Sequence, residues 1–77
     1  MIFKKLKREF PQFANLQANR VSELTHAQRV QIAKALWHAP HSARQERVKG
    51  RLYMYQTLPK EMLRRNLYTS LKIYYNE

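Results

Sequence analysis

The chain has 77 residues and carries 15 lysines and arginines against five acidic residues, which gives a formal net charge of +10. A chain of this length forms one small domain, and its 44% hydrophobic content excludes a disordered polyelectrolyte. The sequence contains no cysteine, which excludes disulfides and thiolate metal sites, and no apolar run approaches the roughly 20 residues that span a bilayer.

The composition favours helix, because glycine occurs once while Leu, Lys, Arg, Gln and Ala are common. We therefore expect an all-α fold. It should be a single domain over residues 1–77, formed as a compact bundle of three to four short helices. One pair of these helices is a candidate for a helix-turn-helix-like unit.

Residues 2–10 form the first expected helix, which is amphipathic. At about 100° per residue its apolar side chains fall on one side: Ile2, Phe3, Leu6 and Phe10. Its basic side chains take the remaining surface: Lys4, Lys5, Lys7 and Arg8. We expect the apolar side to dock on the body of the domain. A membrane-surface helix shows the same pattern over a longer stretch, and a transit peptide is likewise amphipathic and poor in acids.

The next stretch, residues 11–23, gives the weakest pattern. Pro11 suits the first position of a short helix that ends near Arg20, with Phe13 and Leu16 facing inward. Asparagine and serine residues interrupt this stretch and weaken the helix prediction, because they favour caps and turns.

Two helices separated by a break follow, over residues 26–38 and 43–56. The start of each carries the residues of a capping box: Thr25 with Gln28, and Ser42 with Gln45. Pro40 lies between them, where its missing N–H and fixed ring end a continuing helix. The residues of the first helix expected inside are Val30, Ala33, Leu36 and Trp37. We expect Trp37 to anchor the core rather than to stack on a base.

The helix–break–helix unit partly matches a helix-turn-helix, in which the second helix enters the major groove. In such a unit Arg44 and Arg47 would contact bases or phosphates. The usual turn glycine is absent, however, and the match places Glu46 where an apolar residue is normally needed. A generic helical hairpin is the alternative that we favour.

The second helix of this pair carries an arginine stripe. Arg44, Arg47 and Arg51 recur at i, i+3 and i+7. They border an apolar stripe of three residues: Val48, Leu52 and Tyr55. Planar guanidinium groups in a row suit phosphate groups, and we expect these three arginines to surround the core without internal partners. Gly50 lies on neither stripe, so it marks either a close contact or a weak point of the helix.

The last helix is expected to run from about residue 58 to residue 75. Its core stripe consists of Leu63, Leu67, Leu71 and Tyr74. Further apolar residues lie on the opposite side: Leu58, Met62 and Ile73. Tyr68 and Tyr75 extend the core stripe towards Arg64 and are expected to be partly exposed. A helix that is apolar on two sides is either central in the bundle or half exposed, and the second case implies self-association or a partner.

No catalytic or metal-binding group of residues stands out. His38 and His41 have the spacing of zinc ligands, but the chain has no cysteine or aspartate to complete a set. A single glycine cannot form a phosphate-cradling loop, and the glutamates are scattered, with Glu46 and Glu61 placed to pair with nearby bases. We expect a protein that is not an enzyme and that needs no cofactor and no metal.

The surplus of positive charge indicates a polyanionic partner: nucleic acid first, an acidic protein surface second and an anionic membrane third. The expected contact residues are Arg44, Arg47, Lys49 and Arg51, supported by Arg64, Arg65, Lys4, Lys5, Lys7 and Arg8. One alternative is a small phage-type inhibitor or adaptor that docks on an acidic surface of a protein such as a polymerase or nuclease. A subunit of a ribonucleoprotein assembly is another.

A homodimer is compatible with each of these hypotheses. The lack of cysteine suits the cytoplasm, which would be the host cytoplasm for a phage protein, and the amphipathic N-terminal stretch leaves an organellar matrix as the alternative.

Overall fold

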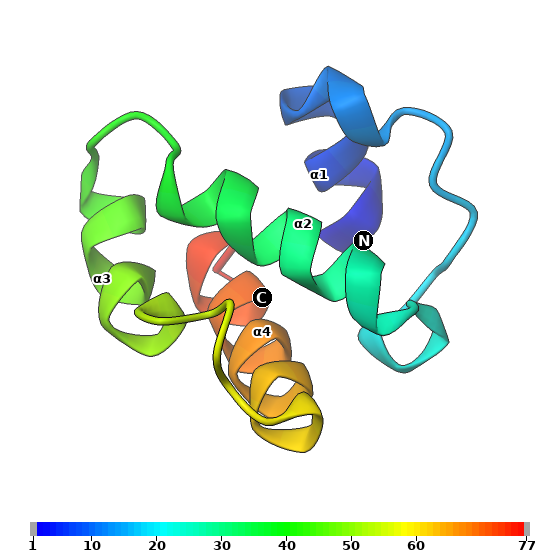
Figure 1. The fold of residues 1–77 in the computed structure, drawn as a ribbon. Coiled ribbons are helices and arrows are strands. Elements are labelled where there is room, and N and C mark those ends of the chain that lie inside the picture. Colours follow the sequence, from blue (N-terminus) through cyan, green and yellow to red (C-terminus); the bar gives the residue numbers. More distant parts are fainter. Residues whose placement is uncertain (1, 77) are drawn as a thin grey trace.

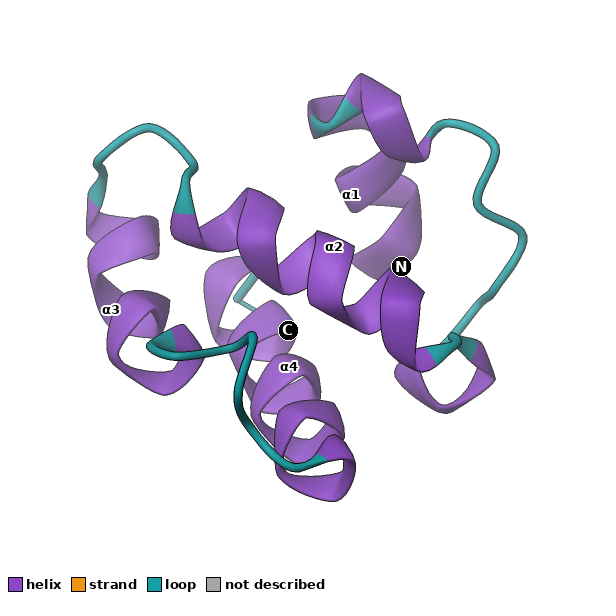
Figure 2. Cartoon of the chain, viewed as in Figure 1, coloured by secondary structure: helices purple, strands orange, loops and turns teal. Residues whose placement is uncertain are grey.

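The computed structural model describes residues 2–76 and contains helices and turns but no strand within that range. Its α-helices are α1 (Ile2–Glu9), α2 (His26–Trp37), α3 (Ala43–Leu52) and α4 (Lys60–Tyr74). Two 3-10 turns lie between α1 and α2, namely η1 (Pro11–Phe13) and η2 (Val21–Glu23) (Figures 1 and 2). The all-α prediction is confirmed.

Side-chain hydrogen bonds cap the two helices on either side of the break. Thr25 Oγ1 accepts a bond of 3.0 Å from the backbone N–H of Gln28, and Gln28 Oε1 accepts one of 2.8 Å from the backbone N–H of Thr25. This capping box is therefore confirmed. Ser42 Oγ accepts a bond of 3.2 Å from the backbone N–H of Gln45. The Gln45 side chain does not return to Ser42; its Nε2 donates to the Trp37 carbonyl at 3.0 Å. Gln45 thus ties the start of α3 to the end of α2.

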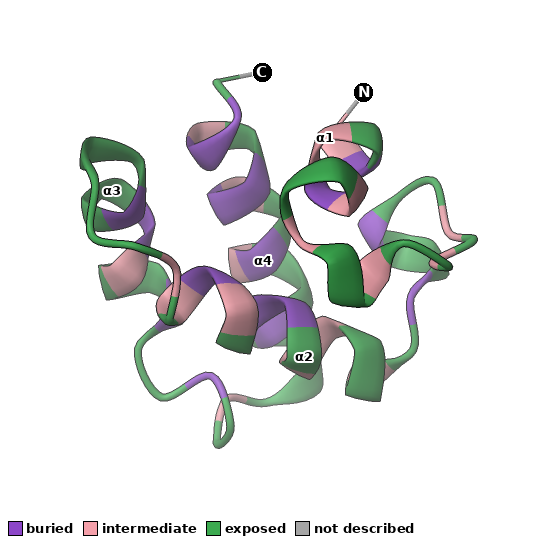
Figure 3. Cartoon of the chain, turned by 90° about the horizontal axis from the view of Figure 1, so that it is seen from above, coloured by how far each residue is buried: buried purple, intermediate pink, exposed green. Residues whose placement is uncertain are grey.

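The antiparallel pairing of α3 with α4 is the most extensive helix contact in the described part of the chain. Arg44, near the start of α3, lies over the Tyr74 ring at the end of α4. Asn66, in the middle of α4, donates a hydrogen bond of 3.2 Å to the carbonyl of Arg51 near the end of α3. Figure 1 shows α2 crossing this pair, and Figure 3 shows α4 lying between α3 and α1. Because α4 contacts α2, α3 and η2, it is the central helix of the bundle.

The core is mainly aliphatic and draws residues from all four α-helices. The fully buried large side chains, apart from Ser70, are Leu6, Ile32, Leu36, Val48, Leu52, Leu63, Leu67 and Leu71. Tyr55 and Tyr74 are also buried, as the stripes of the last two helices predicted. The buried sides of the helices face one another in Figure 3.

Trp37 lies at the edge of this core instead of anchoring it. The side chain is half-buried, and its ring packs edge-on against the exposed ring of Tyr53, with centroids 6.0 Å apart. Leu36 takes the inward position at the end of α2, so Trp37, about 100° further round the helix, faces the turn after α3. A turn covers less of an indole than a packed helix would, and the prediction of a core anchor is wrong.

Two expected helices are shorter by four or more residues in the structure, while the last helix covers Lys60–Tyr74 instead of residues 58–75. The helix expected after Pro11 is limited to η1, and an irregular stretch follows it up to η2. The helix α3 ends at Leu52, four residues before the expected end at residue 56. It stops there because Tyr53 leaves the helical conformation, with ψ of 134°, and Met54 follows in a left-handed conformation with φ of 61°. Hydrogen bonds from the backbone N–H groups of Tyr55 and Thr57 close the turn that follows.

The α2–α3 unit differs from a helix-turn-helix in two respects. The connection covers residues 38–42, longer than the usual turn of about three or four residues. Position 46, where the match required an apolar residue, is exposed, and Gln45 is the buried residue at 5% exposure. The most extensive helix pairing is between α3 and α4, across a connection of residues 53–59, whereas the sequence suggested a hairpin of α2 and α3.

Replacing Gly50 by alanine should raise the free energy of unfolding by about 0.5–1 kcal/mol. Gly50 lies within α3, and a Cβ placed there meets nothing within 4 Å. The added methyl group therefore brings the entropy gain of alanine without a clash, which identifies Gly50 as a weak point of the helix. Urea denaturation measures the change, and a variant less stable than the natural chain would contradict this assignment.

Candidate nucleic-acid interface

Each of the four glutamates that the structure describes contacts a basic side chain. The shortest pairs are Glu9–Arg44 at 3.4 Å, Glu23–Arg20 at 3.6 Å, Glu46–Lys49 at 2.7 Å and Glu61–Arg64 at 2.6 Å. The surplus positive charge of the surface therefore resides on the other lysines and arginines, and their placement decides where a polyanion would bind.

Arg44 belongs to a tertiary cluster that we call the Glu9 cluster, formed by Glu9, Arg44, Tyr74 and Tyr75. The guanidinium carbon of Arg44 lies 4.4 Å from the centroid of the Tyr74 ring and 5.7 Å from that of Tyr75. Tyr75 donates a hydrogen bond of 3.1 Å from its hydroxyl to Glu9 Oε1. The cluster joins the end of α1 to α3 and to the end of α4. The prediction that the three arginines lack internal partners is therefore wrong for Arg44.

The two tyrosines of this cluster are buried, which corrects the prediction that Tyr75 is partly exposed. Burial raises the pKa of Tyr75 far above its usual value, and the negative charge of Glu9 and the hydrogen bond to it act in the same direction. Burial also raises the pKa of Tyr74, against the opposing effect of the Arg44 charge. Both phenols therefore keep their protons in the folded protein at pH values where an exposed tyrosine ionises.

The predicted row on α3 divides between two sides of the helix. Arg47 is exposed on the side that faces α4 together with Arg51, whose Nη1 donates a hydrogen bond of 3.1 Å to the Arg47 carbonyl. Lys49 lies across the buried seam from them, and its ammonium contacts Glu46. The hydrogen bond that the Lys49 ammonium donates to the Glu46 carboxylate lowers the pKa of Glu46, so the pair stays ionised. Lys49 is thus separated from the arginine stripe.

Further cations lie on the exposed side of α4. Asn66 contacts Arg51, and helical periodicity places Arg65 about 100° round α4 from Asn66, beyond Ile73, Met62 and Thr69, with Lys72 and Tyr68 following. We define the α3–α4 face by its residues Arg47, Arg51, Arg65, Tyr68 and Lys72. None of its four cations contacts a carboxylate within residues 2–76, and the Lys72 ammonium lies 5.2 Å from the Tyr68 ring centroid.

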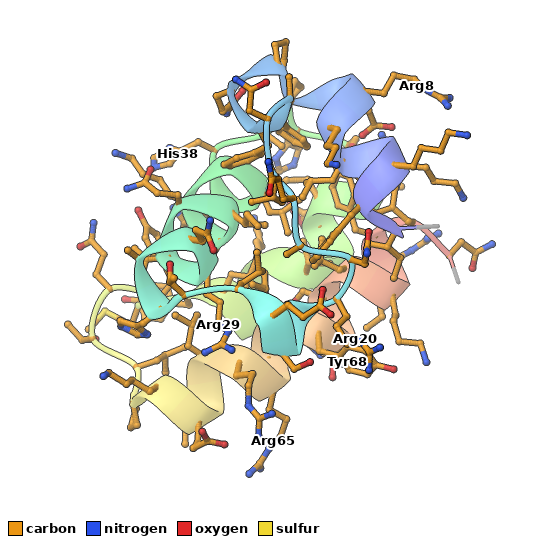
Figure 4. The ribbon with its side chains drawn as sticks, turned by 90° about the vertical axis from the view of Figure 1, so that its right-hand side faces the viewer. Arg8, Arg20, Arg29, His38, Arg65 and Tyr68 are labelled. Carbon is orange, nitrogen blue, oxygen red and sulfur yellow. The ribbon has the colours of Figure 1, made fainter. Side chains whose placement is uncertain are left out.

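The far edge of this face is formed where η2 approaches α4. Tyr68 is 51% exposed and lies between two hollows of about 330 and 260 Å³, both of which it lines together with Arg20 and Val21. The larger hollow is also lined by Arg64 and Arg65. Figure 4 shows Arg20 beside Tyr68, with Arg65 projecting outward near them. Arg20 was not predicted to be a site residue, because nothing in the local sequence pattern indicates that residue 20 lies beside α4.

The basic residues of α1 lie elsewhere. Phe3 and Leu6 are buried, which confirms that the apolar side of α1 docks on the body of the domain. Lys5 and Arg8 line a hollow of about 340 Å³ beside the Glu9 cluster, and this hollow shares no residue with those around Tyr68. In Figure 4, Arg8 and Arg65 project from opposite ends of the molecule. The expected contact residues therefore fall on more than one surface.

Other kinds of site lack structural support. Within residues 2–76 no group of three or more His, Asp or Glu residues is placed to hold a metal ion, and His41 contacts Glu46 at 3.0 Å. None of the helices in this range combines the length and the apolar character needed to cross a membrane.

Comparisons with models of protein families, with curated protein sequences and with solved structures found no match to the chain.

Replacing Arg44 by alanine should lower the free energy of unfolding by about 1 kcal/mol, because it removes both the ion pair with Glu9 and the contact with the Tyr74 ring. The matched control is Arg47→Ala on the same stripe, which should change it by no more than about 0.5 kcal/mol. Urea denaturation of both variants tests this difference. Equal losses would show that the Glu9 cluster adds nothing to stability.

The free energy of unfolding should fall as the pH rises above about 10. The unfolded chain releases the phenolic protons of Tyr74 and Tyr75 there, whereas the folded protein retains them because their pKa values are raised. Below that pH both states are protonated, and this contribution is fully present. Denaturation at a series of alkaline pH values measures the decline, which should be shallower in Tyr75→Phe. Identical slopes in the two proteins would contradict the role of Tyr75.

Proposed function

We propose that this chain is a non-enzymatic nucleic-acid-binding protein that holds the phosphate backbone on the α3–α4 face. The observation that supports the proposal is the accumulation there of four cations without a carboxylate partner in the described chain, because each described glutamate pairs with a different base. Uncompensated charge on a helical surface attracts a polyanion and raises its rate of association.

The types of side chain on this face suit phosphate. Three of the four cations are arginines, whose planar guanidinium groups donate two parallel hydrogen bonds to phosphate oxygens. Arg47 and Arg51 are separated by four residues on α3, a rise of about 6 Å. Arg65 and Lys72 extend the charge along the antiparallel α4, so that the two helices together can follow a backbone over several phosphates.

A second candidate is an adaptor that docks on an acidic protein surface. The observation that favours it is the cluster of large exposed apolar residues around the α3–α4 turn, where Tyr53 is 62% and Met54 is 54% exposed, with Met62 nearby in sequence at 45%. Tyrosine and methionine are enriched in protein interfaces. Affinity purification with and without nuclease treatment separates the candidates, because only a nucleic-acid-dependent association is lost on digestion.

The affinity for nucleic acid should fall with salt with a log–log slope of roughly −3 for a single strand or −4 for a duplex, as expected for four phosphate contacts. The double variant Arg47→Gln with Arg65→Gln removes two contacts and should flatten that slope by about 1.5–2 units. Fluorescence anisotropy of a labelled oligonucleotide, titrated at several salt concentrations, measures both slopes.

The matched control is Lys49→Gln, which removes one positive charge from the other side of α3, where the ammonium already contacts Glu46. Its slope should equal that of the natural chain. No binding at about 50 mM salt would exclude the proposed function. If Lys49→Gln flattens the salt slope by half as much as the double variant, each lost charge has the same effect wherever it lies. The binding surface would then not be the α3–α4 face.

A further inference from the structure

The side chain of Tyr68 is unusual among the tyrosines in its surroundings. It projects from the central helix α4 with 51% of its surface exposed, and basic groups lie on several sides of its ring. The Lys72 ammonium lies 5.2 Å from the ring centroid, and Arg20, Arg64 and Arg65 line the hollow beside it. Within residues 2–76 its hydroxyl makes no hydrogen bond, so the ring has no evident part in holding the fold.

We infer that Tyr68 is a stacking platform for an unpaired base and that the substrate class of the α3–α4 face is single-stranded nucleic acid. This inference rests on the proposed function, and it adds a base-recognition element to the backbone contacts. Aromatic rings on a basic surface bind single strands because each base has a face that stacks, whereas a duplex keeps those faces inside.

The dimensions around the ring fit this role. The hollow on the Arg65 side has a volume of about 330 Å³, at the lower end of the range for small-molecule pockets, and the one on the Phe3 side has about 260 Å³. The first is lined largely by charged groups, and the second mainly by apolar ones, Ile2, Phe3 and Leu71 among them, although Arg20 borders both. A nucleotide whose base stacks on Tyr68 would therefore have the charged hollow on one side for its phosphate and the mainly apolar hollow on the other side for its base.

Acidic groups at this edge are already engaged. Glu61 contacts Arg64 at 2.6 Å, and Glu23 contacts Arg20 at 3.6 Å. The side chains of Glu61 and Arg20 are 75% and 74% exposed, and such surface ion pairs contribute little to stability. A phosphate can replace the carboxylates at small cost, while Arg65 is available without any exchange, because it contacts no carboxylate in the described chain.

Tyr53 is an exposed tyrosine that lies outside the two hollows beside Tyr68. It is more exposed than Tyr68, at 62%, but its ring packs edge-on against Trp37 and lines neither hollow. It therefore serves as a matched control for the loss of an exposed tyrosine ring.

The test compares three ligands of equal charge per strand: an oligothymidylate of about 10 nucleotides, its abasic counterpart, and the corresponding duplex. The natural chain should bind the oligothymidylate roughly fivefold to 100-fold more tightly than the abasic strand, which has the same phosphates but no bases to stack. Tyr68→Leu should lose that preference, Tyr68→Phe should keep it, and Tyr53→Leu should keep it. Anisotropy titrations at one salt concentration measure all the affinities, and circular dichroism verifies that each variant is folded.

The possible results separate this inference from the proposed function. Equal affinity of the natural chain for the normal and abasic strands, with the expected salt slope, would overturn the stacking role while leaving backbone binding in place. This comparison needs no variant, so it holds even if Tyr68→Leu fails to fold. Tighter binding of the duplex than of the single strand would also overturn the inference. Binding of none of the three ligands at about 50 mM salt would overturn both, and would favour a protein partner.

Discussion

The buried leucine seam of α4 is the constraint on which the other features of this domain depend. Leu63, Leu67 and Leu71 are almost completely excluded from solvent, and the helix that carries them is packed by α2, α3 and η2. A helix covered on several sides has only one strip left for solvent, and in α4 that strip includes Arg65, Tyr68 and Lys72, together with Glu61, Met62 and Arg64. The same packing that stabilises the core therefore concentrates the charged and aromatic residues along one outer line.

Strong self-repulsion is the second constraint on so basic a chain. The four glutamates of the described region act locally against it, and three of them pair with a base three residues away in sequence. Glu9 is different, because its partners come from α3 and the end of α4. One carboxylate thus holds together three segments whose other charges repel, while the outer strip of α4 retains the repulsion that a polyanion would relieve.

Periodicity in the sequence was sufficient to predict the buried sides of α1 and α4, and local motifs predicted the capping box of Thr25 and, through Pro40, the position of the break. These features depend on residues within a few turns of one another. The same periodicity places Lys49 away from the arginine stripe, so its separation from the three arginines was predictable from the sequence. The roles of Arg20, Gln45 and Tyr75 could not be predicted, because each depends on a contact between segments whose approach is set by tertiary packing: with Tyr68, the Trp37 carbonyl and Glu9 respectively.

The Glu9 cluster also has a consequence for the order of folding. Its hydrogen bond between Tyr75 and Glu9 joins residues 66 positions apart, whereas α3 and α4 are neighbours joined by a short turn. Closing a long loop costs more chain entropy than closing a short one, so contacts between neighbouring helices form more readily in the transition state. The α3–α4 hairpin is then the natural nucleus, and α1 docks after the barrier has been crossed. Removing the Glu9 carboxylate, which ties α1 to this hairpin, should accordingly speed unfolding while leaving the folding rate almost unchanged.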